Sequence, residues 1–327
     1  MDTKEKSPLH IAFCAGRNYI RYAAVTIKSI VENNRGCDIR IHILSEKLPA
    51  SIRRRLNEAA AGNGDTVRLH IYEVDDTELR GLKLRHWTIY AWYRLLLPET
   101  LSAEITRVLY LDVDIVVAAG LQELFELDLT GKSIAAPFDV QSLFRYAFDR
   151  CGYEPHKKYV CAGVLLMNLD YWREHRLTRQ IIDWARANHA RLAYPDQDAI
   201  NYICRETKIV LPFRFNVYKY YLTGDLHTRP ELFDEIRDCA YRPAIIHYAG
   251  YYPWVKFCAT HPMQAEWEKY NRMLRHPVRS HYVPRRWLLV KQFVWRLVHP
   301  FDERSLFRKG RRLTLEEVKR RLEAYDS

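Results

Sequence analysis

Short apolar runs alternate with longer amphipathic segments through the first third of the chain, and this alternation limits the fold more than any other feature. The apolar runs are rich in β-branched side chains and predict buried strands, whereas the segments between them have apolar residues at helical spacing. Strands that alternate with helices indicate βαβ units, so the sequence predicts an α/β fold with a mostly parallel central sheet flanked by helices. The predicted strands are residues 9–15, 38–45, 66–74 and 106–117, and the predicted helices are residues 18–33, 49–62 and 88–101.

The middle of the chain is less regular and contains no internal repeats. Apolar runs predict further strands here, and segments with helical spacing predict further helices. With 327 residues, 48% of them hydrophobic, the chain is long enough to bury a large core. The predicted strands are residues 132–139, 162–169 and 244–250, and the predicted helices are residues 171–188 and 196–204.

Positive charge is concentrated near the C-terminus. The net charge of the chain is +11, but residues 272–327 contain 15 Lys or Arg and 6 Asp or Glu, so the preceding residues have a net charge of only +2. A nearly neutral body argues against a nucleic-acid-binding face. No run of about 18 apolar residues predicts a membrane span. The seven cysteines form no CxxC pair and the N-terminus has no signal-peptide pattern, so we expect reduced thiols in a cytoplasmic protein.

The sequence changes character at about residue 261, which divides the chain into predicted units 1–260 and 261–327. In the second unit apolar residues recur at spacings of four and three, with Lys and Arg between them, as in a basic amphipathic helix. Such a helix favours attachment to an anionic membrane surface. The alternative is a C-terminal helix that packs on its own domain. The apolar positions are Val283, Trp287, Val290, Val294, Leu297 and Phe301.

Two aspartates, Asp112 and Asp114, follow the apolar run 107–111. Burying an unpaired carboxylate is costly, but a bound cation would compensate both charges. Carboxylate oxygens suit Mn²⁺ or Mg²⁺, and such a metal can also hold a substrate diphosphate. In parallel α/β sheets, ligands bind beyond the carboxyl ends of the strands, where these two residues are predicted to lie.

The same D-x-D triplet also matches the first motif of haloacid-dehalogenase-type phosphatases, in which Asp112 would be a nucleophile and Asp114 a general acid or base. Such folds usually open with this motif and need a later Lys and a further acidic pair. Here about 110 residues precede the motif, and the downstream Lys208 and Asp225 do not complete a convincing set.

Three later segments carry polar residues or glycines suited to a ligand site. His247 ends a short apolar strand, and an imidazole beside two carboxylates would complete a Mn²⁺ site. Gly250, just after it, permits close approach of the backbone to a ligand. Residues 195–201 (PDQDAIN) place three polar side chains at a helix start, where Asp196 is also a good N-cap. Gly163 precedes a strand and fits either close ligand approach or a tight turn.

Taken in order, the motifs FCAGRNY, AWYRLLL, YLDVDIVV, AGVLLMNLDYWR, DQDAIN and HYAGYYPW resemble those of glycosyltransferase family 8, and within it the bacterial lipopolysaccharide and lipooligosaccharide α-galactosyl- and α-glucosyltransferases. The resemblance implies a GT-A-type nucleotide-sugar-binding fold in residues 1–260. It implies a retaining, metal-dependent transfer of a hexose from UDP-galactose or UDP-glucose to a hydroxyl group of a glycan or glycolipid acceptor. It also implies peripheral association with the inner face of the cytoplasmic membrane through the tail.

The resemblance also implies roles for individual residues. Asp112, Asp114 and His247 match the Mn²⁺ ligands, and Gln197 and Asp198 match active-site positions, with Gln197 beneath the anomeric carbon. Tyr19 and His86 match positions on the acceptor side. The positions implied for binding the nucleotide sugar, besides the metal ligand Asp112, are Asn18, Arg94, Val113, Asp139, Gly163, Asp196, Gly250 and Lys256.

The chain departs from the family pattern at three positions. Gly16 stands where the family often has Asp, and Cys161 stands where it has Asn before AGVLL. In the last loop Tyr252 stands where the family has a phosphate-binding Lys, which Lys256 is predicted to replace. These departures leave open a non-catalytic sugar- or nucleotide-binding protein on the same fold, and they leave the donor sugar undetermined.

Overall fold

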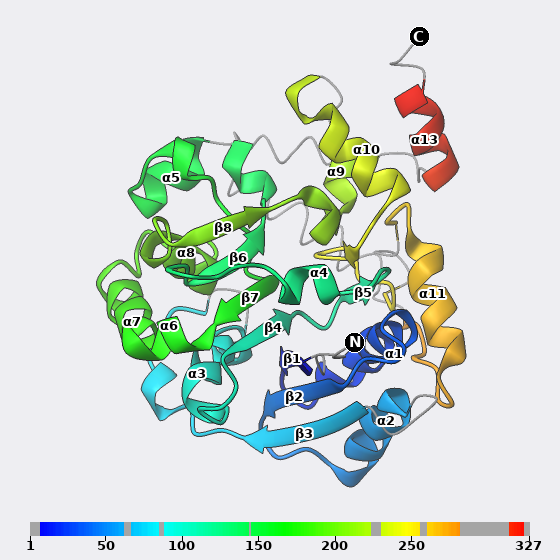
Figure 1. The fold of residues 1–327 in the computed structure, drawn as a ribbon, viewed down its shortest axis with the longest axis horizontal. Coiled ribbons are helices and arrows are strands. Elements are labelled where there is room, and N and C mark those ends of the chain that lie inside the picture. Colours follow the sequence, from blue (N-terminus) through cyan, green and yellow to red (C-terminus); the bar gives the residue numbers. More distant parts are fainter. Residues whose placement is uncertain are drawn as a thin grey trace, which may run out of the picture.

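The computed structural model describes residues 7–61, 67–84, 88–143, 145–223, 230–255, 260–281 and 314–323. A seven-stranded sheet in the order β3-β2-β1-β4-β7-β6-β8 forms the centre of the molecule (Figure 1). Every neighbouring pair in it is parallel except the two that involve β7, which runs antiparallel to β4 and to β6. The predicted α/β fold with a mostly parallel sheet is therefore confirmed. These strands are β1 (Leu9–Cys14), β2 (Ile39–Ser45), β3 (Val67–Glu73), β4 (Arg107–Leu111), β6 (Ile134–Pro137), β7 (Val164–Asn168) and β8 (Lys208–Leu211).

Helices cover both faces of this sheet (Figure 1). Successive side chains of a strand point to opposite faces, and in β1 Ile11 and Phe13 enter one core cluster whereas Ala12 and Cys14 enter the other. Burial on both faces explains why these strands are continuous apolar runs in the sequence. The first core is covered by α1 (Ala23–Asn33), α2 (Ala50–Ala60), α10 (Phe233–Tyr241), α11 (Gln264–Met273) and α13 (Leu315–Glu323), and the second by α3 (Leu97–Thr100), α6 (Leu169–Glu174), α7 (Leu177–Ala187) and α8 (Pro195–Ile203).

A second sheet of three strands, β5-β10-β9, adjoins the end of β4. β10 pairs antiparallel with β5 and parallel with β9. The apolar run 106–117 is therefore two strands in two sheets rather than one strand, and the break between them contains Asp112 and Asp114. The strands are β5 (Ile115–Val117), β9 (Val217–Tyr218) and β10 (Ile245–His247), and the remaining α-helices are α4 (Gln122–Phe125), α5 (Arg145–Cys151) and α9 (Lys219–Thr223).

Three predicted helices are shorter than expected. In the segment 18–33, residues Ile20–Tyr22 form a 3-10 helix and only Ala23–Asn33 are α-helical. Residues 88–101 form the 3-10 helices η3 (Ile89–Ala91) and η4 (Tyr93–Leu96) before α3. Apolar spacings of three fit both kinds of helix, and Pro98 has no N–H group to continue a helix that starts upstream. Residues 171–188 are divided between α6 and α7, because Arg176 adopts a left-handed conformation with φ of 51°.

The C-terminal region contributes two described helices to the main core. Trp267 and Tyr270 of α11 belong to the same core cluster as α1, and the Tyr270 hydroxyl accepts a hydrogen bond of 2.7 Å from Asn33. Val318 and Leu322 of α13 are also buried in this core. The predicted amphipathic helix at 283–301 lies outside the described residues, and the predicted boundary at residue 260 stays a prediction. In the described ranges, no helix combines the length and hydrophobicity that a membrane crossing needs.

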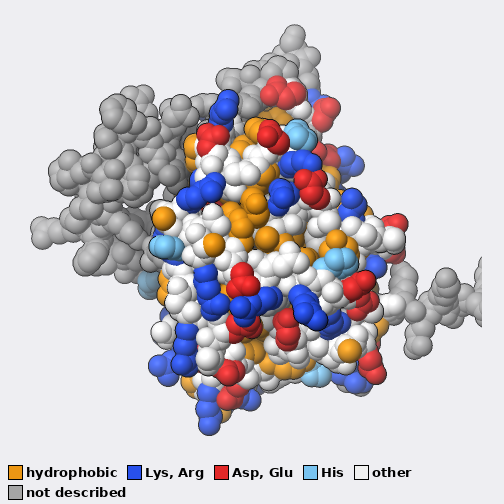
Figure 2. Space-filling model, turned by 90° about the vertical axis from the view of Figure 1, so that its left-hand side faces the viewer, with side chains coloured by type: hydrophobic (Ala, Val, Ile, Leu, Met, Phe, Trp, Pro, Cys, Tyr) orange, Lys and Arg blue, Asp and Glu red, His pale blue; other side chains and the backbone are white. Residues whose placement is uncertain are grey.

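Figure 2 shows the face of the molecule that is on the left in Figure 1, over α5 to α8. Lys and Arg side chains are interspersed there with Asp and Glu, and neither sign dominates. This mixture agrees with the small net charge of the chain before residue 272. All six described cysteines are free thiols, as predicted, and Cys258 lies outside the described residues.

Candidate active site

Three side chains that could bind a metal meet where the two sheets join. Asp112 follows β4, Asp114 precedes β5, and His247 is the last residue of β10. Strand pairing places His247 opposite Ile115, next to Asp114. The backbone N–H of Tyr248 donates to the carbonyl of Asp114 at 2.9 Å, which continues this pairing past the strand ends. The sheet geometry thus brings together residues that are 133 positions apart in the sequence.

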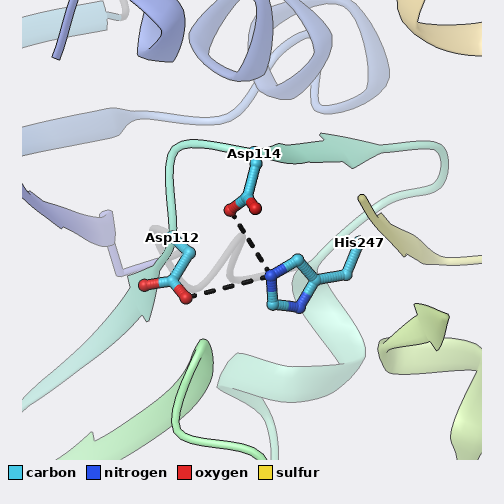
Figure 3. Close-up of side chains that lie close together, drawn as sticks. All are labelled: Asp112, Asp114 and His247. Atoms are coloured by element: carbon cyan, nitrogen blue, oxygen red, sulfur yellow. Dashed lines mark ion pairs between the residues drawn. The ribbon is translucent and has the colours of Figure 1, made fainter. Parts of the chain in front are cut away.

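Both carboxylates point toward the same nitrogen of the imidazole ring (Figure 3). The Nε2 atom of His247 is 3.4 Å from Oδ1 of Asp114 and 3.8 Å from Oδ2 of Asp112. One ligand atom of each residue lies within 4.8 Å of the others. Two hard oxygen donors and an imidazole nitrogen form a donor set that suits Mn²⁺ or Mg²⁺, so these residues fit the predicted metal.

Neighbouring polar groups orient these three side chains. The Nδ1 atom of His247 is 2.8 Å from Oδ1 of the buried Asn216, which leaves Nε2 directed toward the carboxylates. Oδ1 of Asp112 accepts hydrogen bonds from the Tyr110 hydroxyl at 2.6 Å and from Arg94 at 3.2 Å. Burial opposes a charged imidazole, but the Asp114 carboxylate outweighs it and raises the pKa of His247 well above its usual value in the metal-free protein.

Gly163 makes room for this group. It precedes β7, whose antiparallel direction brings its first residue to the edge of the sheet where β4 ends. The carbonyl of Gly163 accepts the backbone N–H of Asp112 at 2.9 Å, so the two backbones are in direct contact. A Cβ atom on Gly163 would lie 2.5 Å from Cε1 of His247 and 2.6 Å from Oδ2 of Asp112. The absence of a Cβ atom at this position therefore allows the side chains of His247 and Asp112 to pack against the backbone. The predicted approach of a ligand to Gly163 stays a prediction.

We call Asp112, Asp114 and His247 the metal-binding group, because they could hold a metal ion together. A cavity of about 910 Å³ opens in front of them, and we call it the donor cavity after the nucleotide-sugar donor that the family resemblance implies. It is lined by most of the residues that the sequence places in a site. Lys256 and His86 lie outside the described residues, and Asp198 does not line the cavity. The predicted residues that line it are Asn18, Tyr19, Arg94, Asp112, Val113, Asp114, Asp139, Gly163, Asp196, Gln197, His247 and Gly250.

Arg94 is buried between two carboxylates. Its Nε atom is 3.4 Å from Asp196, its terminal nitrogen is 3.2 Å from Asp112, and its guanidinium lies over the Tyr110 ring at 4.2 Å. It also donates to the carbonyls of Ala91 and Ala162. Burial raises the pKa of Asp196, although Arg94 acts in the opposite direction. Arg94 therefore braces the metal-binding Asp112 against helix α8 as well as lining the donor cavity.

Gln197 and Asp139 are neighbours in the lining of the donor cavity. Oε1 of Gln197 accepts a hydrogen bond from the Ala162 backbone N–H at 2.8 Å, and its Nε2 atom is 3.4 Å from Oδ2 of Asp139. Burial raises the pKa of Asp139 to about 6, despite hydrogen bonds from the Gln141 backbone and from Gln197 that act in the opposite direction. A carboxyl group that titrates near neutral pH and lines a cavity is typical of a functional site.

Asp198 lies in a closed cluster behind the cavity wall and is fully buried. Its carboxylate accepts hydrogen bonds from Arg150 at 3.0 Å, from the Tyr159 hydroxyl at 2.5 Å, and from the backbone N–H groups of Ala193 and Tyr194. These bonds tie the loop before α8 to the first turn of the helix. The structure thus positions Asp198 to hold α8 in place, and not in contact with the cavity.

The space that a side chain at Gly16 would need is occupied by the ring of Tyr90. A Cβ atom there would lie 2.2 Å from the Tyr90 ring, which covers the glycine. The Tyr90 hydroxyl donates to Glu46 at 2.8 Å, and the Arg17 backbone N–H donates to the same carboxylate at 3.0 Å. Tyr90 and Glu46 line the donor cavity and were not predicted. Glu46 could have been predicted from its position one residue after a predicted strand, whereas Tyr90 has no such signal in the sequence.

The other two departures also lie in the cavity wall. The Sγ atom of Cys161 is 2.9 Å from the Tyr218 hydroxyl and accepts the Gly163 backbone N–H at 3.2 Å. Tyr252 stacks on Trp254, with ring centroids 5.5 Å apart, and meets Tyr19 edge-on at 6.0 Å. The thiol and the ring are thus both built into the wall, although they differ from the residues of the family pattern.

The sequence pattern of Glycosyl transferase family 8 matches residues 10–258. The chain belongs to this family. This membership confirms the predicted resemblance and excludes the phosphatase alternative, which belongs to another family. The match contains every predicted site residue of the chain.

Individual relatives agree with this membership. A lipopolysaccharide 1,2-glucosyltransferase of Escherichia coli is 29% identical over 216 residues, which cover 65% of this chain and 63% of the relative, slightly less than two thirds of its length. General stress protein A of Bacillus subtilis is 26% identical over 284 residues, which cover 84% of this chain and 91% of the relative. The solved structure of galactosyltransferase LgtC with donor and acceptor sugar analogues superposes with a TM-score of 0.72 at 27% identity, and the match covers 85% of this chain and 99% of LgtC. The fold is accordingly of the GT-A type.

Proposed function

We propose that the protein is a retaining glycosyltransferase that moves a hexose from a UDP-sugar to a hydroxyl group of a glycan or lipopolysaccharide acceptor with the help of a divalent metal, Mn²⁺ or Mg²⁺. The observation that carries the proposal is the convergence of Asp112, Asp114 and His247 at one wall of the donor cavity. The names of the E. coli relative and of LgtC support the sugar-transfer reaction, and the name of the E. coli relative supports a lipopolysaccharide acceptor.

The metal would be held by one carboxylate oxygen from each aspartate and by Nε2 of His247. When bound, it would neutralise the diphosphate of the donor and stabilise the leaving group as a Lewis acid. The protein contributes the orientation of these ligands. Asn216 orients the imidazole and Arg94 holds Asp112, whereas Gly163 leaves the space between them free.

The order of strands divides the donor cavity into two ends. β1 and β2 lie on one side of β4, and β7 and β6 lie on the other. With the diphosphate at β4, we assign the nucleoside to the β1–β2 side, where Asn18 and Glu46 line the cavity. We assign the sugar to the other side, where Asp139 and Gln197 line it.

Glu46 suits recognition of a uracil base. Hydrogen bonds from the Arg17 backbone and the Tyr90 hydroxyl lower the pKa of Glu46, so its side chain is a carboxylate at neutral pH. Those bonds occupy Oε1, and a carboxylate has further acceptor sites. Uracil presents a ring N–H donor at N3, whereas cytosine presents an acceptor at the same position. An anionic acceptor would therefore favour the uridine nucleotide.

The sugar end offers an amide rather than a strong base. Gln197 is held by the Ala162 backbone and by Asp139, and it presents a neutral polar group to the ring of the donor. As the bond from the anomeric carbon to the diphosphate breaks, the acceptor hydroxyl would attack from the same face, and the departing phosphate oxygen would take its proton. Retention of the α-configuration follows. Asp196 would contact the donor sugar, and Asp198 would act through its hold on α8.

The remaining predicted contacts are part of the same proposal. Tyr19 lines the cavity and is 39% exposed, which suits a residue on the acceptor side together with His86. Val113 and Gly250 would approach the donor through their backbones, and Lys256 would contact its phosphates. The basic tail would attach the protein to the inner face of the cytoplasmic membrane, where a glycolipid acceptor would lie.

A UDP-release assay with purified protein and Mn²⁺ tests the reaction. UDP-galactose, UDP-glucose and UDP-N-acetylglucosamine would be compared, each with an EDTA control. We expect slow, metal-dependent release of UDP from one donor even without acceptor. If no donor is hydrolysed and UDP with Mn²⁺ does not raise the melting temperature, the transferase proposal fails. A sugar donor that stabilises the protein but is not hydrolysed would instead support the non-catalytic binding protein.

A further inference from the structure

A second cavity, of about 660 Å³, lies beside the first helical turn of the chain and the loop after α11. We call it the basic cavity, because arginines and histidines dominate its lining. Its basic side chains come from three separate segments, the 3-10 helix η1 (Ile20–Tyr22), helix α2 and residues 275–281. These side chains are Arg21, Arg55, Arg275, His276, Arg279 and His281.

The positive charge of the basic cavity is only partly compensated within the described residues. Glu58 lies 3.8 Å from Arg275 and 3.6 Å from His276. Within the residues that the structure describes, neither Arg21 nor Arg55 forms an ion pair with a carboxylate. Arg21 instead donates to the Tyr22 hydroxyl at 3.0 Å and lies over its ring. The four arginines of the lining are thus near a single carboxylate among the described residues, that of Glu58, which also lies 3.9 Å from Arg54 outside the cavity. This differs from the mixed charges of the face in Figure 2.

Arg55 has a donor that is not used. One terminal nitrogen of Arg55 donates to the His276 carbonyl, but its Nε atom is buried and has no hydrogen-bond partner in the described structure. Leaving a buried donor unpaired is costly, and the cost is larger for a charged group. Burial, followed by repulsion from Arg21, lowers the pKa of Arg55. An anion in the basic cavity would relieve both the unpaired donor and the repulsion between the two arginines.

The basic cavity shares a wall with the donor cavity. The Tyr22 ring, which lines the basic cavity, stacks on Trp254 with centroids 4.0 Å apart and an interplanar angle of 5°. Tyr19, which lines the donor cavity, meets both rings edge-on at 5.4 and 5.8 Å. The Trp254 carbonyl accepts the backbone N–H of His281, so the loop of the basic cavity is fixed to the same wall. A ligand in the basic cavity would thus lie next to the predicted acceptor side.

We propose that the basic cavity binds a phosphate monoester, carried either by the acceptor or by a lipid of the membrane beside it. A phosphate monoester has a charge between about −1.5 and −2 and three strong acceptor oxygens. Arginine pairs with phosphate through two parallel hydrogen bonds. The assignment of the phosphate to an acceptor or its membrane rests on the proposed function, whereas the anion site itself does not.

Two variants of neighbouring arginines on α2 test the site. Arg55→Gln removes the charge with the unpaired donor. Arg54→Gln removes a charge that is 72% exposed, does not line the basic cavity and touches the site only through its 3.9 Å ion pair with Glu58. Binding of inorganic phosphate and of glucose 6-phosphate would be measured by calorimetry on the full chain at constant ionic strength, with glucose as a control. We expect Arg55→Gln to weaken binding at least about tenfold, and Arg54→Gln to leave it within about twofold. Arg21→Gln serves as a second variant if Arg55→Gln lowers the melting temperature.

Vesicles distinguish the two sources of phosphate. Phosphatidylcholine vesicles with phosphatidic acid carry a phosphate monoester, and those with phosphatidylglycerol carry a diester with a single negative charge, so the phosphatidylglycerol fraction is raised until both vesicles have the same surface charge. A selective loss of phosphatidic acid binding in Arg55→Gln would assign the site to the lipid, and an effect only on glucose 6-phosphate would assign it to a soluble or glycan phosphate. Equal losses in Arg54→Gln and Arg55→Gln, or no phosphate binding by the wild type, would overturn the proposal. UDP release by the wild type tests the proposed function separately, since phosphate binding does not depend on it.

Discussion

Two groups of carboxylates lie within the same α/β unit, and their surroundings differ. The carboxylate of Asp198 is enclosed by Arg150, Tyr159 and two backbone N–H groups. Asp112 and Asp114 instead point toward one imidazole nitrogen and border an open cavity. Burial of an acidic residue is therefore not by itself a sign of function. A carboxylate whose partners are all supplied by the protein holds the fold together, and one that faces a cavity remains available for a ligand.

The largest effect is expected at the metal-binding group. Asp114→Asn keeps the size of the side chain but removes an anionic oxygen ligand, so we expect the rate of UDP release to fall on the order of a thousandfold or more. The stabilisation by Mn²⁺ in thermal melts would be lost as well. Circular dichroism should remain native, since the substitution is isosteric. A variant with near-normal, EDTA-sensitive turnover would contradict the metal assignment.

Asp198→Ala should lower the stability of the protein and leave metal binding intact, the reverse of the effect expected for Asp114→Asn. Removing this carboxylate leaves Arg150, whose side chain is only 11% exposed, without its ion-pair partner. Breaking a buried ion pair in this way costs about 3–5 kcal/mol of the free energy of unfolding. Urea denaturation would measure the loss. The protein that remains folded should still bind Mn²⁺, and a stable variant that has lost only its metal affinity would place Asp198 with the functional group instead.

The sequence predicted the metal-binding group well because each member has a local signature. Asp112 and Asp114 end an apolar run, His247 ends another, and Gly163 precedes a third. The rule that ligands bind beyond the carboxyl ends of parallel strands places only the two aspartates, which follow β4. His247 belongs to the second sheet and meets Asp114 through the antiparallel pairing of β10 with β5, so its place in the group came from the family resemblance. The family resemblance added Asn18, Asp139 and Gln197, which line the same cavity.

The closed cluster and the basic cavity could not be predicted in this way. Arg150 and Asp198 are 48 residues apart, and no periodic pattern connects them. Arg55 and Arg275 are even further apart, and their meeting depends on how the loop after α11 packs. The 3-10 helices at 88–101 were missed for another reason, because their apolar spacing is compatible with an α-helix. Pairing between distant segments is therefore where sequence patterns carried the least information.

Asp139 shares features with both groups of carboxylates, because it lines the cavity and also accepts hydrogen bonds from the protein. The dependence of its stability contribution on pH should show which group it resembles. Burial raises its pKa from 3.8 to about 6. The protonated form is thus favoured by folding, so this stability is fully present below pH 3.8 and is lost as the pH rises through 6. Relative to Asp139→Asn, the wild type should lose at most about 3 kcal/mol between pH 4 and pH 7, as measured by denaturation without metal.

A control for this measurement has the opposite sign. Hydrogen bonds from Thr77 lower the pKa of the exposed Asp75, so any stability that Asp75 contributes is lost as the pH falls. Asp75→Asn should therefore differ from the wild type in the reverse direction. If the free energies of unfolding of Asp139→Asn and the wild type change with pH in parallel, the pKa of Asp139 is not raised by folding. The protein would then supply enough hydrogen bonds to the Asp139 carboxylate to offset its burial.

Gly163→Ala tests how tightly the metal-binding group is packed. The new methyl group would lie within 2.6 Å of both His247 and Asp112, and at least one of these must move. We expect Mn²⁺ affinity to fall about tenfold to a hundredfold, as for loss of an orienting contact. Gly120→Ala is the matched control, because its methyl group would meet only the end of the flexible Gln122 side chain at short range. Equal Mn²⁺ affinity in the two variants would show that the metal-binding group can accommodate an extra methyl group without losing its geometry.

The smallest effect is expected at the nucleoside end, where Glu46 is open to the cavity but partly satisfied by the protein. Its side chain is 35% exposed and accepts bonds from Arg17 and Tyr90, so it combines features of both groups. Glu46→Gln keeps an acceptor oxygen but loses the charge, and UDP affinity should fall about fivefold to tenfold, whereas CDP affinity should not. Glu73→Gln, at the end of β3 and outside the cavity, serves as the control. An equal loss of affinity for UDP and CDP would mean that Glu46 holds Arg17 and Tyr90 in place and does not contact the base. Its role would then be structural, like that of Asp198.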